Sequence, residues 1–150
     1  MTHVRGGQSF VRGGSPPPAA APKPLHKNES IKSESNFLRG DIAQELVDGN
    51  DFFGKASIQL LKNHGMYQQD NRDARADKRA GGASGKADKA FDFMIRTKIP
   101  GGKLTSAQLL AELDMCDEVG NTTLRITSRQ GLQLHGVLKS NVKRTIQWIN

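Results

Sequence analysis

Cysteine is almost absent from this chain of 150 residues, which contains a single one, Cys116. One thiol cannot form an intramolecular disulfide, and it cannot supply a thiolate cage for a metal. The sequence therefore excludes a disulfide-stapled fold and favours a reducing compartment. It also predicts that the chain has no metal site of its own.

Apolar and aromatic residues are scarce as well, at 35% and 5% of the chain. No apolar run approaches the length of a membrane-spanning helix, and the first residues lack the hydrophobic segment of a secretory signal. We therefore expect a soluble protein that is not exported, resides in the cytoplasm and has no membrane partner.

The segment 1–33 is poor in apolar residues and rich in Gly, Pro and Ser, and it contains VRGG at Val4–Gly7 and again at Val11–Gly14. Such a composition buries too little surface to offset the entropy of ordering, so it predicts a disordered tail. The repeated RGG leaves contact with nucleic acid open. Because no acidic residue precedes Glu29, an organelle transit peptide, and hence a plastid location, is a further alternative.

Residues 34–90 predict an amino-terminal arm with a short helix, a first strand and a loop. Apolar residues at roughly helical spacing place the helix near Asp41–Val47, and Ala56–Asn63 is interpreted as the strand. Asp70–Ala90 is charged and rich in Gly, which is typical of a long loop.

Residues 91–150 predict a second unit, in which regular elements follow one another closely. Phe91–Ile99 alternates like a strand and ends at Pro100. Thr105 and Gln108 match a capping box, which starts a helix that runs to Gly120. An apolar stripe is expected on that helix, with Cys116 as a packed core thiol; its members are Leu109, Leu110, Leu113 and Cys116.

Two more strands and a helix complete this unit, at Thr122–Ser128, Leu132–Lys139 and from about Asn141. Strand, helix, strand, strand, helix is the order of a ferredoxin-like α+β unit, an antiparallel sheet with helices on one face. The other face is then free. The last helix stops at Asn150 without a cap, so we expect residues 91–150 to be a unit truncated at its carboxyl end.

Alternation along the strands predicts a cationic face on this sheet. Arg125, Thr127 and Arg129 point to one side if their strand is extended, and Leu124 and Ile126 to the other. The same register adds further polar residues from the neighbouring strands to the cationic side: Gln133, His135, Lys139, Arg96 and Lys98.

Such a face is suited to an anionic ligand. Arginine binds carboxylates and small oxyanions through two parallel hydrogen bonds. The net charge of +7 agrees with an anionic partner without choosing one. The plain alternative is that these charges are the solvated side of an antiparallel sheet.

Four segments carry a resemblance to a known family: Glu34–Gly40 (ESNFLRG), His64–Asp73 (HGMYQQDNRD), Phe93–Gly102 (FMIRTKIPGG) and Leu124–Lys139 (LRITSRQGLQLHGVLK). In that order they resemble the amino-terminal region of the sirohaem-dependent sulfite reductase haemoprotein, of the nitrite/sulfite reductase family. The resemblance runs from about Glu34 to the end of the chain.

This resemblance implies an enzyme that reduces sulfite to sulfide by six electrons, with sirohaem coupled to a 4Fe-4S cluster. Ferredoxin or an NADPH flavoprotein would supply the electrons. Sirohaem carries eight carboxylates, so the resemblance assigns the cationic face a ligand of opposite charge. It places Arg96 toward the sulfite anion and five residues along the cofactor: Arg125, Thr127, Arg129, Gln133 and His135.

The cluster ligands are missing from this sequence. A 4Fe-4S cluster needs four cysteines, and Cys116 is the only one. We therefore expect a fragment of a sulfite reductase that is inactive alone.

Three alternatives stay open. A nitrite reductase of the same family shares the scaffold, and a catalytically silent ferredoxin-like binding domain has the same fold. A basic nucleic-acid-binding module fits the pI of about 9.8, although the few aromatic residues make nucleic acid an improbable partner.

Overall fold

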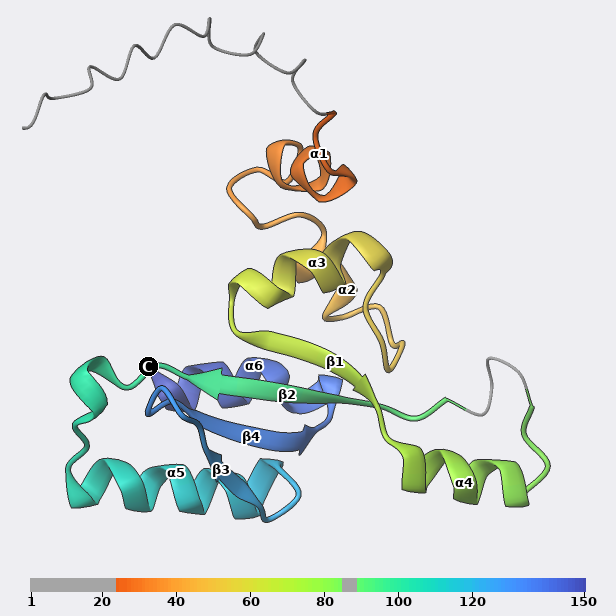
Figure 1. Ribbon diagram of the computed structural model, residues 1–150. Coiled ribbons are helices and arrows are strands. Elements are labelled where there is room, and N and C mark those ends of the chain that lie inside the picture. The colour runs from red at the N-terminus through yellow and green to blue at the C-terminus, as the bar shows by residue number, and fades with distance from the viewer. Residues whose placement is uncertain (1–23, 85–88) are drawn as a thin grey trace, which may run out of the picture.

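The computed structural model describes residues 24–84 and 89–150 (Figure 1). The tail motifs Val4–Gly7 and Val11–Gly14 lie outside these residues. In chain order the elements are α1 Lys27–Ser33, α2 Ile42–Glu45, α3 Lys55–Asn63, β1 Met66–Asp70, α4 Arg72–Ala80, β2 Phe91–Thr97, the 3-10 turn η2 Pro100–Gly102, α5 Ser106–Val119, β3 Leu124–Ile126, β4 Leu132–Val137 and α6 Lys139–Ile149.

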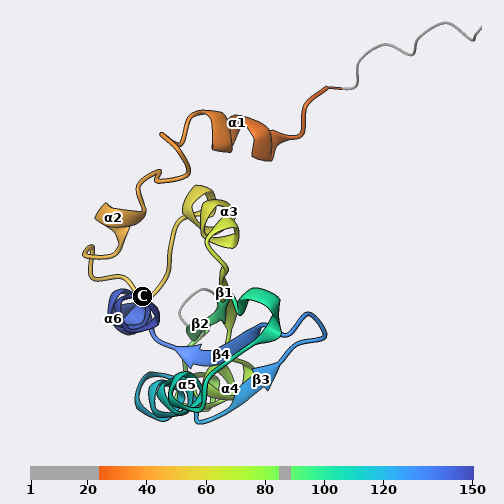
Figure 2. The same ribbon diagram turned by 90° about the vertical axis from the view of Figure 1, so that its left-hand side faces the viewer.

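The four strands form one antiparallel sheet in the order β1-β2-β4-β3. Helices α5 and α6 lie side by side on one face of it (Figure 2). The succession β2, α5, β3, β4, α6 confirms the predicted ferredoxin-like α+β fold. The predicted division at residue 90 falls between β1 and β2, which are paired strands of this sheet.

The core fills the space between the sheet and these two helices. Phe93, Ile95 and Leu134 point into it from β2 and β4, and each is at most 1% exposed. Phe93 meets the ring of Phe53 edge-on, with centroids 5.5 Å apart. Cys116 is 1% exposed, and burial raises the pKa of its thiol, so the prediction of a packed core thiol is confirmed.

The predicted capping box is also confirmed. The hydroxyl of Thr105 accepts from the backbone N–H of Gln108 at 3.2 Å, and the Gln108 side chain accepts from the backbone N–H of Thr105 at 2.9 Å. These two bonds satisfy donors that the first helical turn leaves open.

The strand predicted at Ala56–Asn63 is wrong, because these residues form helix α3. The buried positions of this helix are Ser57, Leu60 and Leu61, and their spacing of i, i+3 and i+4 is that of one helix face. Two adjacent buried leucines do not fit the alternation of a half-exposed strand.

The loop predicted at Asp70–Ala90 is wrong in its first half, where α4 follows β1 directly. The side chain of Asn71 accepts from the backbone N–H groups of Asp73 and Ala74, each at 3.1 Å, and caps the helix. The strand β1 was not predicted. The tail predicted to be disordered to residue 33 is helical over Lys27–Ser33, where His26 provides the cap.

The apolar stripe predicted on α5 is wrong in its orientation. Leu109, Leu110 and Leu113 are 40%, 59% and 42% exposed, so Cys116 is the one predicted member that is buried. The residues that the helix turns toward the core are Glu112, Met115, Cys116 and Val119. Because leucines lie around much of this helix, its sequence does not define which side is buried.

The alternation that was predicted to place Lys139 on the cationic face is wrong at that residue. The pairing of β2 with β4 shifts between Phe93 and Ile95, opposite Gly136, which has φ +74°. A Cβ at Gly136 would lie 2.7 Å from the Cβ of Asn121. The extra residue turns Val137 into the core and leaves Leu138 exposed.

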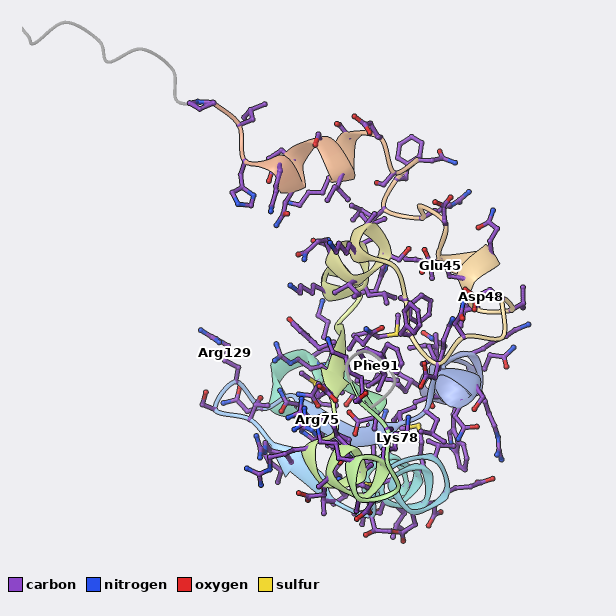
Figure 3. All side chains as sticks on the ribbon, turned by 90° about the vertical axis from the view of Figure 1, so that its right-hand side faces the viewer. Glu45, Asp48, Arg75, Lys78, Phe91 and Arg129 are labelled. Atoms are coloured by element: carbon purple, nitrogen blue, oxygen red, sulfur yellow. The ribbon has the colours of Figure 1, made fainter. Side chains whose placement is uncertain are left out.

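Lys139 consequently lies away from the arginines. Its ammonium is buried and bonds Asp48 Oδ1 at 2.8 Å and the carbonyl of Phe52 at 2.9 Å, 4.7 Å from the centre of the Phe53 ring. Figure 3 shows Asp48 in the segment above α6. Lys139 thus fastens the amino-terminal segment to the start of α6.

Candidate functional site

A row of polar side chains crosses three strands on the sheet face opposite α5 and α6. Gln133 of β4 is paired with Arg96 of β2 on one side and with Arg125 of β3 on the other. Paired residues share a face of the sheet. His135 follows two residues after Gln133 and lies on the same face, so the predicted grouping of these four residues is confirmed as an arrangement.

The guanidinium of Arg96 is held from two sides. Gln133 satisfies both groups when its amide is oriented with the oxygen toward this guanidinium, and the oxygen then accepts from Nη2 at 2.9 Å and from Nε at 3.3 Å. The ring of Tyr67 on β1 lies 5.6 Å from the guanidinium carbon, within the range of a cation–π contact. Gln133 is 8% exposed. Arg96 is thus a fixed cation on the sheet face that α5 and α6 do not cover.

The turn between β3 and β4 presents Arg129. The hydroxyl of Thr127 accepts from the N–H of Gly131 at 3.0 Å, and the backbone N–H of Thr127 donates to the carbonyl of Gly131 at 2.9 Å. Gln130 completes the turn with φ +59°. Figure 3 shows Arg129 at the tip of this turn, pointing away from the sheet.

A cleft of about 760 Å³ lies between this turn and the amino-terminal end of β1. Four predicted site residues line it: Arg96, Thr127, Arg129 and Gln133. His64 and Lys98 also line it. The volume is within the range of cofactor sites, and the cations around it favour an anion.

The other two predicted residues, Arg125 and His135, line a second hollow of about 690 Å³ along β3. His135 Nε2 is buried and has no hydrogen-bond partner in the parts of the chain that the structure describes. Burial lowers the pKa of His135, Arg125 lowers it further, and Asp92 raises it. Burial and the neighbouring guanidinium therefore favour the neutral imidazole over the charged one.

Tyr67 is the site residue that the sequence analysis missed. Recognising Met66–Asp70 as a strand would have revealed it, because Tyr67 pairs with Met94 on the same face as Arg96. Apolar and polar residues alternate less clearly in this segment than in β2. Glutamine stands both at the half-buried position 68 and at the exposed position 69. The carboxamide of Gln68 points to the other side, where it accepts from the backbone N–H of Phe53 at 2.6 Å.

Within residues 24–84 and 89–150 no cluster of three or more His, Cys, Asp or Glu side chains is placed to hold a metal ion. No helix in those residues is long and apolar enough to span a membrane. The side chains that line the two hollows instead include three arginines and a lysine, which suit a carboxylate-bearing group.

Comparison with known proteins relates the sequence of this chain to a family. Residues 85–147 match the family described as nitrite/sulfite reductase ferredoxin-like half domain. The chain belongs to the nitrite/sulfite reductase family. The resemblance expected from the four sequence segments is confirmed.

Three similar family members are sulfite reductases by name. The NADPH sulfite reductase subunit beta of Saccharomyces cerevisiae is 45% identical over 130 residues, 86% of this chain and 9% of that protein. The NADPH sulfite reductase hemoprotein beta-component of Myxococcus xanthus is 44% identical over 130 residues, 86% of this chain and 22% of that protein.

The ferredoxin sulfite reductase of Synechococcus elongatus is 41% identical over 132 residues, 88% of this chain and 20% of that protein. The chain therefore spans less than a quarter of the length of each of these relatives.

Proposed function

We propose that this chain forms the basic wall of the sirohaem and sulfite site of a sulfite reductase, an enzyme that reduces sulfite to sulfide by six electrons. The observation that carries the proposal is the row of Arg96, Gln133 and Arg125 on the open sheet face, with Arg129 at the lip of the same cleft. Such a surface without an anion would concentrate unpaired positive charge.

The residues fit an octacarboxylate such as sirohaem. Arg125 and Arg129 offer guanidinium groups that bind carboxylates through paired hydrogen bonds. His135 lines the same hollow as Arg125 and would lie along the cofactor beside it. Sirohaem, when bound, supplies the iron at which electrons reach the substrate. Thr127 acts through the turn, because its hydroxyl bond to Gly131 fixes the position of Arg129.

Arg96 has a different task in this proposal. Gln133 and Tyr67 already fix its side chain, so its remaining N–H groups are directed before any anion arrives. A positioned cation stabilises a bound dianion and the negative charge that develops as oxygen leaves. Arg96 therefore binds and orients sulfite, while the other arginines hold the cofactor.

The remaining parts of the reaction lie on other residues. The 4Fe-4S cluster requires thiolates, and Cys116 is buried behind the sheet, so we propose that the chain alone is inactive. The relatives' names include both NADPH and ferredoxin enzymes, and either donor fits this proposal. The same names favour sulfite over nitrite as the substrate.

Substitution of the cofactor-facing arginines tests this proposal. In a complete reductase that contains this sequence, Arg125→Ala and Arg129→Ala should each reduce the sirohaem absorbance per protein. Arg144→Ala is the matched control, because Arg144 lies on α6 and bonds Glu118. Full sirohaem content in both variants would refute the assignment of the cationic face to the cofactor.

A further inference from the structure

A second cleft lies on the opposite side of the sheet from the arginines, among β2, α5 and the end of α6. Its volume is about 200 Å³. Its walls are mixed, and their apolar members include Leu104, Met115, Trp148 and Ile149. A cleft of this size is smaller than the sites that hold cofactors or drug-sized ligands, so it has room for about one side chain.

Glu112 is the acidic group in the wall of this cleft and comes from the buried side of α5. The residue is 9% exposed, and its Oε2 has no hydrogen-bond partner among the described residues. Burial raises the pKa of the carboxyl, and the neighbouring hydroxyl of Thr97 lowers it by a smaller amount. A buried carboxylate without a partner is costly, so its retention requires an explanation.

The nearby cations do not neutralise Glu112. Lys98 also lines the cleft, but its side chain is exposed and forms no ion pair with Glu112 among the described residues. Arg144 bonds Glu118 and lies over the ring of Trp148 at 5.7 Å. Neither is among the groups that shift the pKa of Glu112.

We propose that this cleft, the Glu112 pocket, receives a lysine or arginine side chain from another segment of the longer polypeptide. The aliphatic stem would lie against Trp148 and Met115, and the charged end would bond Oε2 of Glu112. Charge complementarity selects the occupant, because a cation is what a buried carboxylate lacks.

The surroundings of the pocket fit a covering polypeptide better than a small amine. Leu104 at its wall and Leu109, Leu110 and Leu113 along α5 are 36–59% exposed, and grouped exposed apolar side chains mark contact surfaces. The chain covers 22% of the Myxococcus xanthus relative. In a protein of that length most of the polypeptide lies outside these residues, so this inference rests on the family membership and not on the cofactor assignment.

A titration with n-butylammonium tests the pocket directly. Trp148 is the only tryptophan, so its indole N–H resonance reports on the pocket. The resonance should shift saturably with n-butylammonium, should not shift with n-butanol, and should lose the response in Glu112→Gln. Asp114→Asn is the matched control, since Asp114 lies exposed on the same helix. An equal response to n-butanol, or a retained response in Glu112→Gln, would overturn the proposal.

The source of the occupant is tested in the complete protein. There, Glu112→Gln should lower the midpoint of thermal unfolding by several degrees, because the partner's cation loses its carboxylate. The same substitution in the 150-residue chain should leave the midpoint unchanged or raise it. A lower midpoint in both, or in neither, would show that no other segment of the polypeptide fills the pocket. The cofactor assignment is tested separately, by the sirohaem content of the Arg125 and Arg129 variants, so either proposal can fail without the other.

Discussion

The carboxamide of Gln133 accepts two hydrogen bonds from the guanidinium of Arg96, across the pairing of β4 with β2. Gln133→Leu removes this acceptor and keeps an apolar side chain of similar size. Because one hydrogen bond contributes about 1 kcal/mol, the Nε–H of Arg96 should exchange with solvent about fivefold faster. Proton exchange measured by NMR would check this.

Gln69→Leu is the control for that exchange, because Gln69 lies exposed on β1. It should leave the Arg96 signal unchanged. An Arg96 Nε–H that exchanges equally fast in the Gln133 variant and the unaltered protein would contradict the positioning role of Gln133.

The cap of α4 depends on Asn71, whose side chain also donates to Asp92 at 3.1 Å. Asn71→Ala should destabilise α4 by about 1–2 kcal/mol, since the first turn loses its acceptor. Amide hydrogen exchange in Arg72–Ala80 should rise. Asn71→Ser retains a capping oxygen and should restore much of the protection. Equal protection in the alanine variant would show that the cap does not hold the helix.

The buried ammonium of Lys139 joins two distant segments of the chain, through Asp48 and the carbonyl of Phe52. Lys139→Met keeps the stem and removes both bonds, so the free energy of unfolding should fall by about 1–3 kcal/mol. Chemical denaturation measures this value. Lys143→Met, at an exposed position of α6, should change it little, and an unchanged stability in the Lys139 variant would be inconsistent with the anchoring role.

The ion pair of Lys139 with Asp48 makes the stability of the fold depend on pH. Hydrogen bonds from Lys139 and Asn50 lower the pKa of Asp48 from 3.8 to about 2. A carboxyl with a lowered pKa stabilises the fold above its unfolded pKa, and this contribution disappears as the pH falls through the folded value. Stability should therefore decrease between about pH 4 and pH 2, and Asp48→Asn should flatten that decrease. An unaltered pH profile would contradict the pairing.

The sequence predicted those parts of the fold that local signals define. The capping box at Thr105 and Gln108, and the clear alternation of β2, have short-range causes. The side of α5 that is buried depends on tertiary packing, because Glu112 faces the core while Leu109 and Leu110 do not. No periodicity argument places a glutamate inside and leucines outside.

In the candidate site, too, the features with local causes could be predicted from the sequence, and those that depend on long-range pairing could not. Strand alternation placed Arg96, Arg125 and Gln133 on one face, as the pairing confirms. The bulge at Gly136 turned Lys139 to the other side, since one extra residue reverses the alternation. Tyr67 required knowledge of which strand pairs with β2, a long-range relationship that the residue pattern of β1 does not contain.

Substitution of Arg96 tests the central claim most directly, with two readouts in a complete reductase that contains this sequence. Arg96→Ser removes the guanidinium that Gln133 and Tyr67 position, and leaves Arg125 and Arg129 in place. The account predicts that sulfite turnover falls while sirohaem absorbance per protein is retained. Loss of the cofactor, or sulfite turnover equal to that of the unaltered enzyme, would contradict it.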